Sequence, residues 1–202
     1  MYRSDTIYHL YNHSNGYQPV FRSEENYIFF LQKVRKHLYP VAEIICYCLM
    51  PDHFHFMIMP KHEGCQPSAS LKPNNGKSDN EEDVFQQEIS HQLRVLLSSY
   101  TKAYNRRYNL RGSLFRAKTK AKPAYNDFLP EDFLMRDDIP FTQFIPYLKI
   151  CFQYIHNNPV KAGLANLPTE WEFSSALDYS SLRDGTLCNY ALAERLIGIQ
   201  RL

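Results

Sequence analysis

Two histidines, His53 and His55, stand one residue apart in the apolar stretch 49–60, which has the sequence LMPDHFHFMIMP. In an extended chain alternate side chains share a face, so both imidazoles point to one side while Phe54 and Phe56 point to the other. Histidine is the commonest metal ligand, and two of them leave coordination positions for a substrate oxygen or a further side chain. The spacing indicates a divalent-metal site. The alternative is two histidines on the polar face of an amphipathic strand.

A second pair of polar residues lies near the end of a helix that the sequence predicts over residues 142–158, with Pro159 ending it. Tyr154 and Asn158 are four residues apart, so they lie one turn apart and can act on the same point. The alternative is a tyrosine packed over the core and an asparagine near the helix C-terminus. Spacing alone leaves both interpretations open.

The length and composition predict one sizeable core. The chain has 202 residues, of which 44% are hydrophobic, and its 15 Tyr and 13 Phe exclude global disorder. We expect one catalytic-type domain over residues 1–165, with a flexible insertion at 61–83 and an extension at 166–202 packed on the same domain. No stretch approaches the roughly 18 apolar residues of a transmembrane helix and no apolar signal segment opens the chain, so we expect a soluble, cytoplasmic protein.

The five cysteines form no CxxC pair and are expected to be reduced thiols. Cys46 and Cys48 lie close in sequence to the histidine pair, which raises a zinc site as an alternative. A structural zinc site normally uses ligand pairs brought together by a knuckle or turn, and neither pair has that spacing.

Positive charge is concentrated in one segment, although the net charge of +2 is small. Between residues 94 and 122 there are nine Lys or Arg and no Asp or Glu, interleaved with aromatic residues. Such a segment can follow a phosphate backbone and offer rings for base stacking. The alternative is a solvated helix face followed by a basic loop. The candidate DNA contacts are Arg106, Arg107, Arg111, Arg116, Lys118, Lys120 and Lys122.

Hydrophobic periodicity predicts the element order β-α-β-β-α-β over the first 123 residues. Strands are expected at 6–12, 42–50, 53–60 and within 111–123, and helices from Ser23 to Pro40 and over 84–108. This order is typical of the α+β class with a ferredoxin-like (split βαβ) fold, a four-stranded antiparallel sheet with helices on one face. The helix that carries Tyr154 is an addition to it.

Two motifs resemble those of a known family. Residues 50–56, MPDHFHF, resemble the HUH motif of single-tyrosine transposases, and residues 147–164, YLKICFQYIHNNPVKAGL, resemble the tyrosine helix of their REP-associated branch. The similarity extends from Tyr8 and His9 to the segment 171–176, WEFSSA, and leaves out residues 61–83 and about 124–140.

The resemblance implies an enzyme, a HUH endonuclease and DNA strand transferase acting in DNA transposition or REP-element mobilisation. Its members nick and rejoin single-stranded DNA through a 5′-phosphotyrosine. Tyr154 matches the nucleophile, and His53, His55 and Asn158 match the ligands of a divalent metal, Mg²⁺ or Mn²⁺. Asn158 stands where many insertion-sequence members have glutamine, and Asp52 stands where asparagine is frequent.

The resemblance also implies the partners: single-stranded or hairpin DNA, and a second copy of the chain in a homodimer with composite active sites. Sequence does not decide whether Tyr154 meets His53 of its own chain or of a partner, nor which DNA is recognised. Two other functions stay open, a non-catalytic DNA- or RNA-binding module on the same fold and a replication-initiator-type HUH nuclease.

Overall fold

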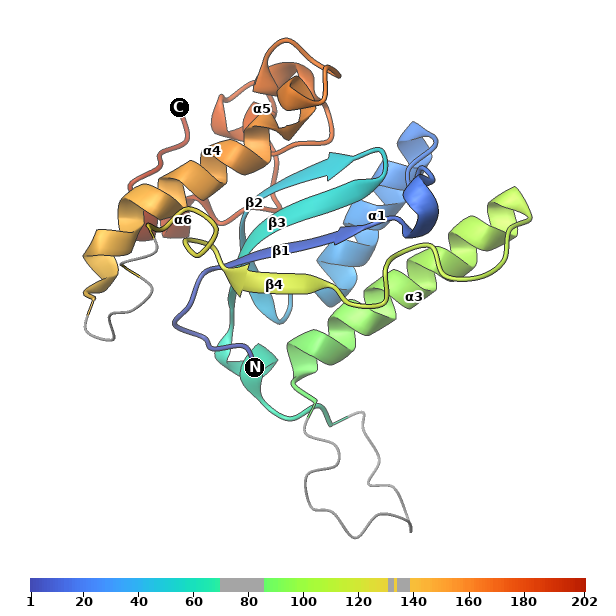
Figure 1. Ribbon diagram of the computed structural model, residues 1–202, viewed down its shortest axis with the longest axis horizontal. Helices are drawn as coiled ribbons and strands as arrows, with labels where there is room; N and C mark the ends of the chain where they lie inside the picture. The colour runs from blue at the N-terminus through green and yellow to red at the C-terminus, as the bar shows by residue number, and fades with distance from the viewer. Residues whose placement is uncertain (70–85, 131–132, 134–138) are drawn as a thin grey trace, which may run out of the picture.

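A hairpin of two long strands forms the middle of the structure. β2 (Ala42–Met50) and β3 (His53–Pro60) run antiparallel and are joined by two residues, as the sequence predicts. β1 (Tyr8–His13) pairs with β3, and β4 (Lys120–Pro123) pairs with β1, so the order is β2-β3-β1-β4. Figure 1 shows this sheet in the computed structural model, which describes residues 1–69, 86–130, 133 and 139–202. The expected ferredoxin-like α+β arrangement is confirmed.

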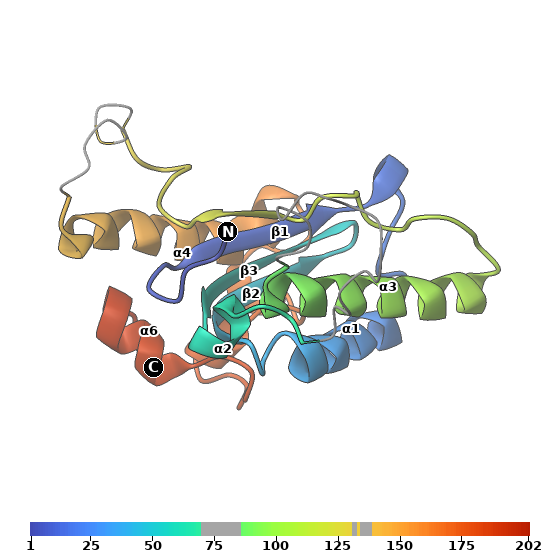
Figure 2. The ribbon, with the colours of Figure 1, turned by 90° about the horizontal axis from the view of Figure 1, so that it is seen from below.

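Helices cover both faces of the sheet. α1 (Glu24–His37) and α3 (Glu88–Tyr108) lie side by side on one face, and α4 (Ile145–Lys161) lies on the other (Figure 2). The sheet is therefore the middle of three layers. Within the described residues, no helix is both long enough and apolar enough to cross a membrane.

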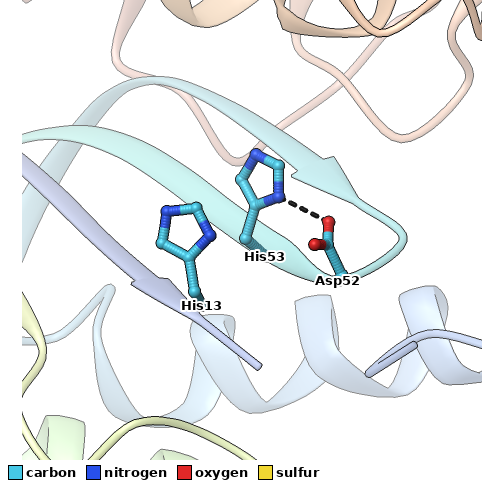
Figure 3. Close-up of side chains that lie close together, drawn as sticks. All are labelled: His13, Asp52 and His53. Carbon is cyan, nitrogen blue, oxygen red and sulfur yellow. Dashed lines mark hydrogen bonds and ion pairs between the residues drawn. The ribbon is translucent and has the colours of Figure 1, made fainter. Parts of the chain in front are cut away.

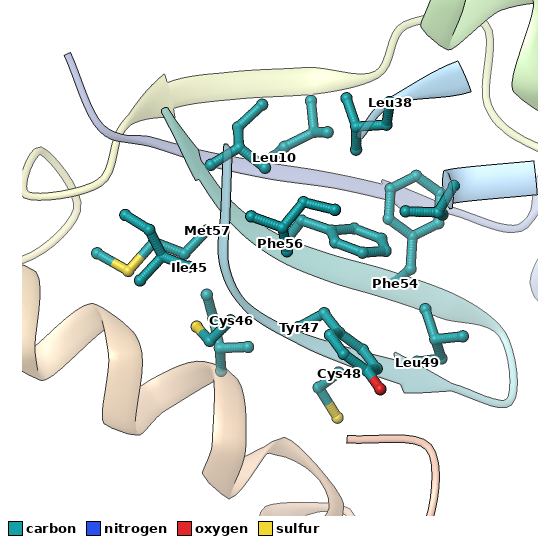
Figure 4. Packing of buried hydrophobic residues seen from close by; sticks show 14 of the residues in the cluster. Leu10, Leu38, Ile45, Cys46, Tyr47, Cys48, Leu49, Phe54, Phe56 and Met57 are labelled. Carbon is teal, nitrogen blue, oxygen red and sulfur yellow. The ribbon is translucent and has the colours of Figure 1, made fainter. Parts of the chain in front are cut away.

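The face toward α1 and α3 is filled by aromatic side chains. Phe54 and Phe56 alternate with the histidines of β3 and are almost fully buried. The ring centroid of Phe30 on α1 lies 5.3 Å from that of Phe54 and 5.1 Å from that of Tyr100 on α3. Figure 4 shows buried side chains around β2 and β3, among them Phe54 and Phe56. Because this face is apolar, the chemistry of the sheet is confined to the opposite face.

The end of α4 differs from the prediction. The helix does not stop before Pro159 but continues through it to Lys161, and its expected first turn is a 3₁₀ turn, η3 (Phe141–Phe144). Proline lacks the N–H that would bond the carbonyl of Ile155 four residues earlier. The side-chain Nδ2 of Asn158 lies 3.4 Å from that carbonyl and 2.8 Å from the carbonyl of Tyr154. The asparagine amide therefore replaces part of the missing backbone donor.

Other boundaries also shift. β1 ends at His13 rather than at residue 12, and a 3₁₀ turn, η1 (Asn15–Tyr17), follows it. α3 begins at Glu88, because Gln86 is not helical and Gln87 has an extended backbone; residues 84 and 85 lie outside the described part. The predicted flexible insertion contains a short helix, α2 (His62–Cys65), and its residues from 70 onward lie outside the described part.

The segment after α4 covers the edge of β2. It contains η4 (Pro168–Glu170), α5 (Ala176–Tyr179) and α6 (Tyr190–Ile197). The Leu49 N–H donates to the Phe173 carbonyl at 2.9 Å, and the Ser175 N–H donates to the Tyr47 carbonyl at 3.0 Å. Further along, the Asn189 N–H donates to the Ile44 carbonyl at 2.8 Å. An edge strand left unpaired would be a template for another chain, and this segment occupies it.

An ion pair with a buried carboxylate holds this segment in shape. The Asp178 carboxylate, 1% exposed, accepts from Arg183 Nε at 2.6 Å and from Nη2 at 3.0 Å. The same Nη2 also reaches the Tyr47 hydroxyl on β2, at 3.1 Å. Burial lowers the pKa of Arg183, but the hydrogen bond and charge of Asp178 outweigh it and raise that pKa above its ordinary value. A Cβ on Gly185 would clash with the Asp178 carboxylate, so glycine is required there.

We expect Asp178→Asn to lower the free energy of unfolding by about 3 kcal/mol, because it leaves a charged, partly buried guanidinium without its partner. Asp184→Asn is the matched control, because Asp184 is 88% exposed and bonded to Arg201 at 2.9 Å. Such an exposed pair contributes about 0–1 kcal/mol. Urea unfolding measures both variants, and equal losses would contradict the structural role of Asp178.

Candidate metal and tyrosine site

The pairing of β1 with β3 gathers imidazoles on the face toward α4. Tyr11 is opposite His55 and His13 is opposite His53, so side chains of both strands lie next to one another. With His9 and residues from the loop after β4, they line a pocket of about 360 Å³. The lining residues are His9, Tyr11, His13, His53, His55, Asp127, Phe128 and Tyr154. The site thus combines two neighbouring strands, a loop and α4.

His13, Asp52 and His53 form a cluster that could hold a metal ion (Figure 3). One ligand atom from each lies within 4.8 Å of the others. His53 Nδ1 lies 2.6 Å from Asp52 Oδ1, and the His13 and His53 rings stack with centroids 4.5 Å apart. In the part of the chain that the structure describes, this is the one such group of His, Cys, Asp or Glu, and it contains no cysteine. The cysteine alternative for a metal site thus has no cluster there.

His9 and His55 are buried and hydrogen-bonded to each other, with His9 Nε2 and His55 Nδ1 2.8 Å apart. Burial lowers the pKa of His9 to about 4, and burial with the neighbouring histidine charges lowers the pKa of His55 well below its ordinary value. Both rings are therefore neutral near pH 7, which is the form that binds metals. The other nitrogen of His9, Nδ1, is buried and has no hydrogen-bond partner among the described residues.

Tyr154 reaches the same pocket from α4. Its ring centroid lies 5.8 Å from that of His55 and 5.9 Å from that of His9 in the same chain. Lys161 Nζ lies 4.8 Å from the ring centroid. Burial, with the nearby Tyr11, raises the pKa of Tyr154, so the hydroxyl keeps its proton unless a cation stabilises the phenolate. The structure therefore brings His53, His55 and Tyr154 to one pocket.

Asn158 is not brought to it. Its amide nitrogen turns back to the α4 carbonyls, and the residue is not among those that line the pocket. Its assignment as a metal ligand stays a prediction. His156 faces away from the pocket, as its spacing from Tyr154 indicates: its Nε2 lies 2.8 Å from Ser175 Oγ and the ring is buried.

Five residues that line the pocket are missing from the candidates that the sequence supplies: His9, Tyr11, His13, Asp127 and Phe128. The density of turn formers after residue 12 places His13 in a loop, whereas it is the last residue of β1. The signal that indicates it is the period of two in His9, Tyr11 and His13, which puts all three on one face of a strand. Asp127 carries no sequence signal of this kind.

The seven predicted basic contacts are spread over three elements. Arg106 and Arg107 lie in the last turn of α3, and Arg107 is 3.7 Å from Glu25. The next three, Arg111, Arg116 and Lys118, lie in the connection to β4. Lys120 and Lys122 lie on β4, opposite Tyr11 and His9. Lys122 Nζ is bonded to Asp127 at 2.7 Å, which places an ion pair at the pocket.

No protein-family model and no curated protein matches the chain. Among solved structures, one that is similar is the REP-associated tyrosine transposase bound to a REP hairpin. The alignment covers 95% of this chain and 92% of that chain, with 12% identity and a TM-score of 0.49. Likeness at this level leaves the activity of the present chain to be argued from its own residues.

Proposed function

We propose that the chain nicks and rejoins single-stranded DNA, with Tyr154 as nucleophile, as a HUH-type single-tyrosine transposase. The observation that carries the proposal is the convergence of Tyr154 with His53 and His55 on one pocket of a single chain. Neutral imidazoles can hold a metal ion or accept a proton, and either can activate a neighbouring tyrosine hydroxyl for attack on a phosphodiester. DNA transposition or REP-element mobilisation is the biological setting that the two sequence motifs support.

The reaction balances without an external energy source. The Tyr154 hydroxyl oxygen forms a bond to phosphorus, the bond from phosphorus to the 3′ oxygen breaks, and that oxygen takes the proton lost by the phenol. One strand is left joined to Tyr154 through its 5′ phosphate, and the other ends in a 3′-hydroxyl. Because the linkage to Tyr154 is itself a phosphodiester, attack by a 3′-hydroxyl reverses the step and joins strands.

The donors present fit a divalent cation. Two imidazole nitrogens and a carboxylate oxygen in the His13–Asp52–His53 cluster suit Mn²⁺ better than Mg²⁺, which prefers oxygen ligands. When bound, such an ion would supply positive charge to the phosphoryl oxygen and to the phenolate. We propose that His53 and His55 hold it, with His13 and Asp52 completing the set.

His9 has a positioning role in this proposal. If His55 binds the cation through Nε2, its Nδ1 carries the proton and donates it to His9 Nε2, 2.8 Å away. That bond fixes both the tautomer and the orientation of His55. It also places the proton of His9 on Nδ1, the buried atom without a partner.

The partners follow from the same chemistry. Single-stranded or hairpin DNA is the proposed substrate. Lys120 and Lys122 on β4 lie on the pocket side of the sheet, where we propose that they contact the DNA phosphates. The homodimer stays a prediction. The approach of Tyr154 to His55 within one chain supports a site that needs no tyrosine from a partner.

We expect His13→Ala and His53→Ala each to weaken Mn²⁺ binding at least about tenfold. Asn158→Ala is expected to leave it within about twofold, because Asn158 does not line the pocket. Isothermal titration of Mn²⁺ measures this, with His62→Ala as the control on the short helix α2. Loss of affinity in Asn158→Ala but not in His13→Ala would instead identify the ligand set implied by the family resemblance.

We expect the wild type to form a covalent adduct with 3′-labelled single-stranded oligonucleotides in the presence of Mn²⁺, and Tyr154→Phe to form none. The 3′ label is needed because the downstream strand is the one that stays on the tyrosine. Tyr147→Phe, on the same helix, is the matched control and should retain the adduct. Denaturing gels of a hairpin library resolve the products, and binding without any adduct in the wild type would indicate a non-catalytic module.

We expect a mixture of His53→Ala and Tyr154→Phe proteins to stay inactive, because each chain uses its own tyrosine. If the tyrosine acts in trans, the mixture regains up to about a quarter of wild-type adduct. About half of the randomly formed dimers then combine the two variants, and one of the two composite sites in each such dimer is intact. Each variant alone is the control. Recovery in the mixture would establish composite sites and the homodimer together.

A further inference from the structure

A second pocket lies away from Tyr154, between α3 and the connection that leads to β4. Its volume is about 590 Å³, within the range of ligand-binding pockets. Leu93 and Leu97 of α3 and Phe115 of the connection supply its apolar surface. We call it the α3 groove.

Three cations line the α3 groove: Arg94, Lys102 and Arg116. Arg94 and Lys102 are eight residues apart on α3, so they project from the same side of the helix about two turns apart. No Asp or Glu is among the lining residues, and within the described residues none of the three cations has an acidic partner. Among the described residues, the hydrogen-bond partner of Arg94 Nη2 is the Nδ1 of His91, at 3.1 Å. The groove is thus positively charged and uncompensated over that part of the chain.

The connection that lines the α3 groove is hydrogen-bonded to the end of β1, where His13 lies. The Arg116 N–H donates to the His13 carbonyl at 3.0 Å, and Ser14 forms a bridge with Phe115. From β1, Asn12 Nδ2 donates to the Arg116 carbonyl at 3.1 Å and to Thr119 Oγ1 at 3.0 Å. Arg116 therefore adjoins both the α3 groove and the His13–Asp52–His53 cluster. The groove and the cluster lie on the two sides of the short connection that contains Phe115 and Arg116.

We propose that the α3 groove binds the sugar–phosphate backbone of the DNA strand that flanks the bond attacked by Tyr154. This rests on the proposed function for the identity of the polyanion as DNA and for Tyr154 as the attacking residue. Phosphates lie on the three cations, and sugars and bases contact Leu93, Leu97 and Phe115. Contacts of this kind hold a strand in register without reading its sequence. A strand leaving the groove past Arg116 arrives beside His13.

The test measures the binding of a fluorescent single-stranded oligonucleotide over a series of salt concentrations, with EDTA present so that no cleavage occurs. We expect Arg94→Gln and Lys102→Gln each to reduce the slope of log affinity against log salt by about 0.7, and the double variant by about 1.4. Lys36→Gln is the matched control, because Lys36 is an exposed cation on α1 outside the groove. Thermal melting verifies that all variants are folded.

A double variant with the slope of Lys36→Gln would overturn the proposal, even if the adduct with Tyr154 forms. A reduced slope supports the groove even if no adduct forms, so its failure and that of the catalytic proposal are distinguishable. Competition with polyglutamate provides a second arm. If the double substitution weakens polyglutamate binding as much as DNA binding, the groove is a general anion surface and the proposal is overturned.

Discussion

The register between β1 and β3 is the constraint on which the site depends. It sets His13 opposite His53 and Tyr11 opposite His55, and it leaves Phe54 and Leu10 on the other face. A slip of one residue would turn a whole row of imidazoles toward the aromatic core and a row of apolar side chains toward α4. The hydrophobic packing against α1 thereby fixes the geometry of the polar face without touching it.

The position of Tyr154 follows from contacts that other residues of α4 make. His156 is bonded to Ser175 Oγ, and the Ser175 N–H is bonded in turn to the Tyr47 carbonyl on β2. Cys151 and Ile155 are fully buried against the sheet. These contacts fix the rotation of α4 about its axis. The tyrosine ring is therefore held beside His9 and His55 partly by the segment after α4, none of whose residues lines the pocket.

Much of this arrangement follows from the sequence, and the exceptions have physical causes. The element order and the hairpin at Pro51 are predictable because strand alternation and turn formers agree there. The extension of β1 to His13 is not, because it depends on pairing with a strand forty residues away in the chain. The continuation of α4 through Pro159 depends on a side-chain amide that supplies a missing donor, which no propensity expresses. Tertiary contacts override local signals at both places.

The covering of β2 also has a consequence for synthesis. β2 is a strand of nine residues, and within the part of the chain that the structure describes its outer edge is bonded by residues 171–189, which leave the ribosome after all four strands have been made. Until then a long apolar edge is open to any extended chain nearby. We therefore expect residues 171–189, which are translated after the four strands, to protect the nascent protein against aggregation once they pair with β2.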